Sequence, residues 1–123
     1  MLLLPSVALA TTHNFAAAGN DANPCTSASP CQTITKAQTF LSSMLPGDQL
    51  LFNRGDTFTF TTGLTLPAHM NGTSGSRIVI GNYGSGALPV FDGGGVAFAC
   101  VNARKTGSGG TPIFSYITID GIE

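Results

Sequence analysis

The chain is 123 residues long, only 9% of its residues are charged, and its formal net charge is −1. This length suits one small domain, and the charge argues against a nucleic-acid-binding protein, which usually has a clustered basic patch. The basic residues are instead scattered, at Lys36, Arg54, Arg77, Arg104 and Lys105. Many short apolar runs, broken by Gly, Ser, Thr and Asn, are typical of an all-β fold with many turns.

The first ten residues form an apolar leader. Residues 8–10, Ala-Leu-Ala, fit the small-x-small pattern before a signal-peptidase cut, and the sequence becomes polar at Thr11. We therefore predict a signal peptide over 1–10 and a protein that is secreted or displayed at the cell surface. The basic residues that usually open such a leader are missing, so either the natural start lies upstream or the signal is weak. A buried strand is the alternative, and the run is too short to span a bilayer.

A short strand is predicted over 13–18, and a polar loop with two of the three cysteines follows it. Cys25 and Cys31 lie six positions apart. A thiol pair in an exposed polar loop suits an oxidising compartment, where a disulfide persists, and so short a ring adds on the order of 2 kcal/mol of stability. A metal site would need more ligands nearby, and a redox pair needs Cys-x-x-Cys, which is absent. Cys100 lies in an apolar run and is expected to be a buried free thiol.

The segment 33–44, with the sequence TITKAQTFLSSM, is the one convincing helix. Its apolar side chains recur at spacings of three, four and three residues and therefore share one face: Ile34, Ala37, Leu41 and Met44. Thr33 is expected to be the N-cap. The Leu-Pro-Gly-Asp sequence at 45–48 should end the helix, because proline cannot extend it and glycine permits a turn.

After the helix the sequence predicts only short strands and turns. The strands are expected at 49–52, 57–60, 64–67, 77–83, 90–92, 96–101 and 116–122. Those that contain Leu64, Val90 and Ile117 repeat at intervals of 26 and 27 residues, which indicates stacked coils that each add one rung. A helix at one end of such a stack supplies a cap, since a bare first rung would leave backbone N–H and C=O groups unpaired.

Four segments carry a resemblance to a known family. In chain order they read GNDANPCTSASPCQTITKAQTFL, PGDQLLFNRGDTFT, RIVIGNYGSGALPVFDGGG and YITIDGIE. They resemble the amino-terminal part of secreted right-handed parallel β-helix proteins of the pectin-lyase-like superfamily. The resemblance implies an all-β fold in which 11–123 form a capping α-helix and the first coils of an incomplete β-helix domain. Some relatives carry a cysteine at both positions that match Cys25 and Cys31, which supports the disulfide.

The resemblance also implies a secreted, carbohydrate-active protein that binds a polysaccharide. A polysaccharide lyase or glycoside hydrolase is the leading prediction, and a non-catalytic, adhesin-like surface protein is the alternative. In the family's lyases a basic residue and carboxylate-bound Ca²⁺ act on central coils. The catalytic residues are therefore unknown from this sequence and are expected beyond Glu123. No cofactor or metal is expected within this segment, although Ca²⁺ fits the full-length protein, and no nucleic-acid partner is expected.

Three carboxylates lie near the ends of predicted strands, namely Asp92, Asp120 and Glu123. With later coils they could contribute to a Ca²⁺ or sugar-binding face. We favour turns at Asp92-Gly93 and Asp120-Gly121, because Asp can bond its own backbone and Gly supplies a positive φ. No second acid is spaced so as to complete a glycosidase carboxylate pair within this segment.

Several further motifs are short and carry little weight. Arg-Gly-Asp at 54–56 spells an integrin-binding tripeptide, but the resemblance explains it as a turn between strands. The segment 81–86 superficially resembles a phosphate loop and lacks both the lysine and the following helix. Asn-Gly-Thr at 71–73 is a glycosylation sequon that matters only in a eukaryotic host. Phe91 and Phe98 are expected in the core.

Overall fold

The computed structural model describes residues 9–68, 70–95, 99–103 and 115–123. Most of the predicted signal peptide lies outside these residues, as do Phe98, Arg104 and Lys105. Within them the chain forms eight short strands and one helix, and every strand pairing in the sheets is parallel. The fold is therefore all-β with one helix, as predicted. None of the described helical structure has the length and apolarity that a membrane crossing requires.

The largest sheet contains four parallel strands. Each comes from a different pass of the chain, and a pass is a stretch of chain that contributes at most one strand to each sheet. In spatial order they are β1 (Thr12–Phe15), β2 (Gln49–Asn53), β5 (Ile78–Tyr83) and β8 (Ile117–Ile119). His13 pairs with Leu50, Leu50 with Ile80, and Ile80 with Ile119. The burial pattern of β2 alternates, with Leu50 and Phe52 fully buried, because successive side chains of a strand point to opposite faces.

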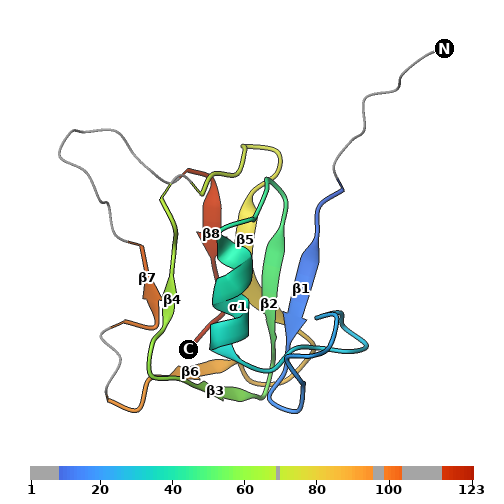
Figure 1. Cartoon of the computed structure of the whole chain (residues 1–123), viewed down its shortest axis with the longest axis vertical. Helices are drawn as coiled ribbons and strands as arrows, with labels where there is room; N and C mark the ends of the chain where they lie inside the picture. Colours follow the sequence, from blue (N-terminus) through green and yellow to red (C-terminus); the bar gives the residue numbers. More distant parts are fainter. Residues whose placement is uncertain (1–8, 69, 96–98, 104–114) are drawn as a thin grey trace.

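Two smaller sheets follow the same order of passes. They pair β3 (Thr57–Thr59) with β6 (Val90–Asp92), and β4 (Leu64–Thr65) with β7 (Val101–Asn102). The pass β2–β3–β4 therefore lies strand for strand beside the pass β5–β6–β7 (Figure 1). Each strand is too short to bury much surface alone, so stacking of the passes builds the core.

The predicted repeat of 26 and 27 residues is wrong. Leu64, Val90 and Ile117 belong to three different sheets. True partners lie further apart, since Ile80 pairs with Leu50, 30 positions earlier, and with Ile119, 39 positions later. One pass contains three strands joined by turns of unequal length. The similar apolar triplets that contain Leu64, Val90 and Ile117 therefore occupy different positions within their passes.

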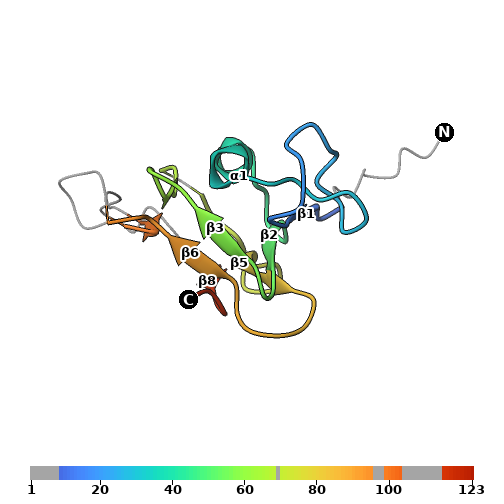
Figure 2. The same ribbon diagram turned by 90° about the horizontal axis from the view of Figure 1, so that it is seen from below.

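Helix α1 (Ile34–Leu41) begins where the sequence predicted. The Thr33 side chain accepts a hydrogen bond from the Lys36 N–H at 3.0 Å, which confirms the N-cap. Ile34, Ala37 and Leu41 are buried, as expected for the apolar face. The helix ends at Leu41, earlier than predicted, because the Ser43 N–H and hydroxyl both bond the Phe40 carbonyl in a turn. Figure 2 shows α1 on the opposite side of β3 from β6, where it covers one end of the stack.

The core is centred on four phenylalanines from four strands. Phe52 lies 5.1 Å from Phe15, 5.1 Å from Phe58 and 4.8 Å from Phe91, measured between ring centroids. Each such pair adds about 0.5–1.5 kcal/mol to the burial of its surface. The prediction that Phe91 lies in the core is confirmed. This cluster packs β1 against the passes β2–β3–β4 and β5–β6–β7, and it thereby fixes the position of β3.

Candidate functional site

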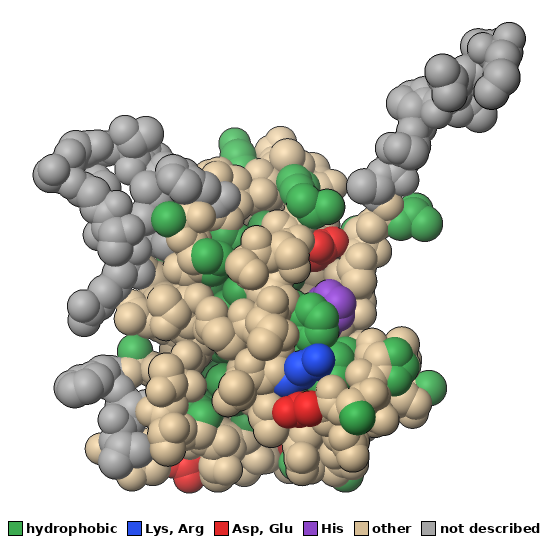
Figure 3. Space-filling model, in the orientation of Figure 1, with side chains coloured by type: hydrophobic (Ala, Val, Ile, Leu, Met, Phe, Trp, Pro, Cys, Tyr) green, Lys and Arg blue, Asp and Glu red, His purple; other side chains and the backbone are tan. Residues whose placement is uncertain are grey.

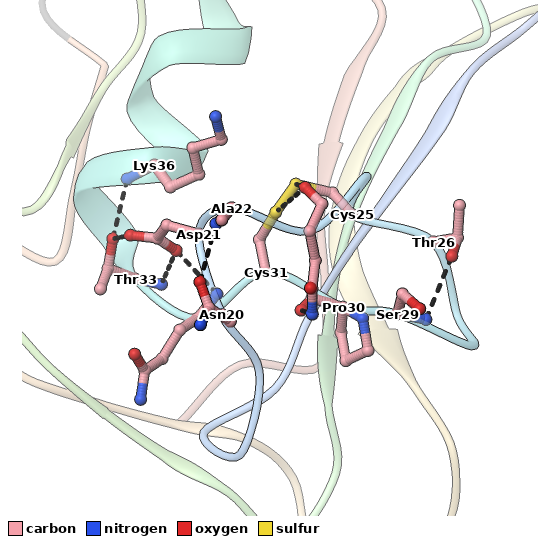
Figure 4. The surroundings of a disulfide bond; sticks show 12 residues. Asn20, Asp21, Ala22, Cys25, Thr26, Ser29, Pro30, Cys31, Thr33 and Lys36 are labelled. Carbon is pink, nitrogen blue, oxygen red and sulfur yellow. Dashed lines mark hydrogen bonds between the residues drawn. A yellow bond between two sulfur atoms is a disulfide. The ribbon is translucent and has the colours of Figure 1, made fainter.

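The predicted disulfide between Cys25 and Cys31 is present (Figure 4). Both cysteines are buried, at 1% and 0% exposure, although the loop that holds them was predicted to be exposed. The reason is that the loop packs along the free edge of β1. The Asn14 N–H donates to the Cys25 carbonyl at 2.7 Å, and the Cys31 N–H donates to the Asn14 carbonyl at 3.0 Å. The crosslink therefore holds a loop that covers the edge of the first strand.

Asp21 ties the same loop to the start of α1 (Figure 4). Its carboxylate accepts hydrogen bonds from the Gln32 N–H at 2.8 Å, from the Thr33 N–H at 2.9 Å and from the Thr33 hydroxyl. Partial burial raises the pKa of Asp21, but these hydrogen bonds and the nearby Lys36 charge outweigh it, so the pKa lies below its ordinary value. The sequence did not predict this role, because Asp21 is separated from Gln32 and Thr33 by the loop that holds Cys25 and Cys31. We call this loop the cysteine loop.

A single side chain closes the edge of β4. The Gln38 Oε1 accepts from the Thr65 N–H at 2.7 Å, and the Gln38 Nε2 donates to the Thr65 carbonyl at 3.0 Å. The side-chain amide thus forms the two bonds that a neighbouring strand would form. This is how the helix acts as a cap, and the sequence pattern alone did not single out Gln38.

The edge of β3 has no comparable cover. Within the described residues β3 pairs only with β6. The Val90 N–H bonds the Asp56 carbonyl and the Phe60 N–H bonds the Asp92 carbonyl, so alternate backbone groups of this strand face β6. By the same alternation the N–H and C=O groups of Thr57 and Thr59 point the other way, toward the start of α1.

Two adjoining cavities, of about 330 and 430 Å³, lie along this open edge, and a third, of about 330 Å³, continues toward Gln38 and Thr65. The first two share Thr33, Ile34 and Thr59, and the last two share Thr35. We call the continuous hollow the threonine groove. Its principal lining residues are Thr35, Thr57, Thr59, Phe60, Thr61 and Asp92. Figure 3 shows few charged side chains on the face of the molecule that carries α1.

The carboxylates singled out in the sequence do not form a metal site here. The Asp92 Oδ1 accepts from the Gly94 N–H at 2.8 Å, which confirms a turn, and Gly121 has the positive φ of 64° expected after Asp120. The Asp120 and Glu123 side chains make no hydrogen bond within the described part of the chain. No group of three or more His, Cys, Asp or Glu side chains there is placed to hold a metal ion.

The Arg-Gly-Asp sequence forms a turn, as predicted. The Arg54 Nε donates to the Asn82 Oδ1 at 2.8 Å, and the Asp56 Oδ2 accepts from the Ala17 N–H at 2.9 Å. Gly55 has a φ of 85°, which glycine adopts without strain. Both charged side chains are therefore bound to the body of the protein rather than presented together to a partner.

The prediction that Cys100 is a buried thiol is wrong, because Cys100 is free and exposed. The apolar run that contains it was expected to be a strand, but the described part of that run is strand only from Val101, where β7 begins. The alternation that would have turned Cys100 into the core is therefore absent. Its Sγ lies 3.5 Å from the Phe91 carbonyl.

No family model and no curated protein matches the chain. Among solved structures, it is similar to GH136 lacto-N-biosidase from Eubacterium ramulus. The native structure is 31% identical, with a TM-score of 0.54, and its selenomethionine derivative is 28% identical, with a TM-score of 0.51. Each match covers 65% of this chain and 12% of that enzyme. The chain thus spans about an eighth of the length of the solved structures it matches, and its structural neighbours are glycoside hydrolases.

Proposed function

We propose that this chain is the amino-terminal cap and first coils of a right-handed parallel β-helix in a secreted glycoside hydrolase. The similarity to lacto-N-biosidase is the observation that carries the proposal. The match to this carbohydrate-active enzyme covers 65% of the chain at 28–31% sequence identity. Identity at this level indicates more than a shared fold. The match also favours a hydrolase over a lyase, which was the other enzyme class expected from the sequence.

Three features support the β-helix and the secretion. Successive passes pair strand for strand in three parallel sheets, as stacked coils require. Helix α1 covers one end of the stack, with Gln38 bonded to the edge of β4. The buried disulfide between Cys25 and Cys31 suits an oxidising compartment, which agrees with the signal peptide that we propose over 1–10.

We place the catalytic groups on other coils of the same protein. Glycosidases use two carboxyl groups, one of them free to give or take a proton. Four of the six acidic side chains of this chain already accept hydrogen bonds from backbone N–H groups: Asp21, Asp48, Asp56 and Asp92. Such bonds already occupy carboxylate oxygens and fix the four side chains to the protein's own backbone. These four residues therefore hold the backbone in place.

The test compares this 123-residue chain with the protein encoded by the complete reading frame that contains it. Both are incubated with an oligosaccharide that contains lacto-N-biose and with polygalacturonate. New reducing ends and the ultraviolet absorbance of unsaturated uronates are measured. We expect the complete protein to release reducing ends from the neutral oligosaccharide, with no unsaturated product, and the 123-residue chain to be inactive on both.

Each other outcome contradicts a named part of the proposal. Unsaturated uronates would make the protein a lyase. Hydrolysis by the 123-residue chain would place the catalytic groups within it. Oligosaccharide binding without cleavage by the complete protein would favour the non-catalytic alternative. If the complete reading frame encodes no further strands of this pattern, the proposed β-helix is wrong.

A further inference from the structure

We propose that the threonine groove is a carbohydrate-binding site for a neutral oligosaccharide, separate from the catalytic site of the enzyme. The choice of a sugar as the ligand rests on the proposed function. The position of the site and its preference for an uncharged, hydroxyl-rich ligand rest on the groove itself.

The groove is the open edge at the capped end of the stack. The cysteine loop bonds the edge of β1, and Gln38 bonds the edge of β4. Between them, within the described part of the chain, the backbone groups of Thr57 and Thr59 face a hollow in place of a protein partner. Unpaired backbone N–H and C=O groups need a partner from solvent or from a ligand, so this edge presents fixed donors and acceptors.

Side-chain hydroxyls extend this polar surface. Thr35 lies on the first turn of α1, and Thr57 and Thr59 are the exposed residues of β3. Within the described residues none of these three hydroxyls makes a hydrogen bond. A threonine hydroxyl both donates and accepts, as does each hydroxyl of a sugar. The threonine groove therefore matches a ligand that carries many hydroxyls along its length.

The lining of the groove also includes an aromatic ring and carries little charge, and both features suit a neutral sugar. Phe60 is half-buried against Phe91, with 5.9 Å between ring centroids, and lines the middle cavity. Binding sites commonly join such an apolar surface to a few placed polar groups. Among the described residues, no Lys or Arg lines the three cavities, and Asp92 is the one acidic residue in their lining. A uronate polymer would meet repulsion there without a compensating cation.

A peptide that adds a strand to β3 is the competing occupant. Peptide binding of that kind depends on a row of main-chain hydrogen bonds along an exposed edge. Strand β3 has three residues, and only Thr57 and Thr59 direct backbone groups into the groove. So short a row offers a peptide little, whereas the same groups with the neighbouring hydroxyls suit a compact sugar.

The experiment titrates the oxidised, isotope-labelled 123-residue chain and follows backbone amide signals by NMR. The probes are lacto-N-biose, cellohexaose, trigalacturonate and an extended alanine peptide. Three variants are compared with the parent chain. Thr59→Val removes one groove hydroxyl at constant shape, Thr59→Ser keeps it, and Thr12→Val makes the matched change on an exposed β1 residue outside the groove.

We expect at least one of the two neutral sugars to shift the amide signals of Thr57 and Thr59 saturably. Thr59→Val should weaken its binding about fivefold, the effect of one lost hydrogen bond, and Thr59→Ser and Thr12→Val should bind like the parent. Three results would each overturn the proposed sugar site. They are no saturable shift with either neutral sugar, stronger binding of trigalacturonate or of the peptide, and an equal loss of binding in Thr59→Val and Thr12→Val. The proposed hydrolase fails separately, in the activity assay.

Discussion

Asp21, Asp48 and Asp56 each accept hydrogen bonds from backbone N–H groups in loops and turns. Asp48 accepts from the Thr11 and Leu45 N–H groups, both at 2.8 Å, and Asp56 accepts from the Ala17 N–H at 2.9 Å. At the scale of the residue, these three carboxylates therefore hold irregular backbone in place. The same holds for Arg54, which donates to the Asn82 side chain and the Gly86 carbonyl.

The disulfide should contribute measurably to stability. Replacing Cys25 and Cys31 together by alanine should lower the free energy of unfolding by about 2 kcal/mol, because the unfolded chain loses a crosslink. Urea denaturation of the oxidised proteins measures the change, and Cys100→Ser is the control, since its thiol is free and exposed. Peptide mapping without reductant should recover the Cys25–Cys31 bridge. Two alkylatable thiols at these positions would contradict it.

His13 should make stability depend on pH. It stacks on Phe40 with 3.8 Å between ring centroids, and burial lowers its pKa, partly opposed by the negative charge of Asp48. The unfolded chain, with a histidine pKa of about 6.5, therefore binds the proton first as the pH falls. The contribution of His13 is complete above that value and is lost as the pH falls through the lower, folded pKa.

The measurement for His13 is the free energy of unfolding between about pH 8 and pH 5, across the ordinary histidine pKa. His13→Phe keeps an aromatic ring on Phe40 and removes the titration. Its stability should fall less steeply than that of the parent protein over this interval. Parallel curves for the two proteins would show that His13 titrates alike in the folded and unfolded states.

At the scale of the element, the cap consists of two different devices. The cysteine loop covers β1 with backbone hydrogen bonds, and α1 covers β4 with the side chain of Gln38. Strand edges that stay bare promote pairing with other chains. Both devices are polar, which explains why hydrophobic periodicity alone did not reveal them.

Gln38→Met tests the second device. Methionine keeps the length and the helix propensity of glutamine but cannot form the two bonds to Thr65. The Thr65 amide should exchange with solvent faster, and the free energy of unfolding should fall by about 1 kcal/mol. Thr39→Ala, on the exposed side of the same helix, is the control. Unchanged exchange at Thr65 in Gln38→Met would show that the side chain does not pair with the strand.

Local signals made parts of this fold predictable. The spacing of Ile34, Ala37 and Leu41 and the N-cap Thr33 lie within a few residues of one another, so the sequence was enough to place the helix. Strand register was not predictable in this way, because it depends on the lengths of all three turns in a pass. The threonine groove was missed for a related reason, since it joins the start of α1 to a strand more than 20 residues later.

At the scale of the whole molecule, β8 is an edge strand of the four-stranded sheet that the described residues form. Ile119 on this strand is 46% exposed. An edge that combines unpaired backbone with β-branched side chains favours association, so the 123-residue chain should self-associate. Ile119→Lys should lower its average mass in sedimentation, because charge on an edge opposes pairing. Leu45→Lys, at an exposed turn residue, is the control, and an equal effect of both changes would remove the role of the edge.

The cap, the groove and the proposed β-helix all depend on the stacking of successive passes. NMR distances between backbone protons test this most directly. We predict close contacts of the parallel type between Leu50 and Ile80 and between Ile80 and Ile119. Contacts that instead join the strands of Leu64, Val90 and Ile117, or the short α-proton pairs of antiparallel strands, would contradict it.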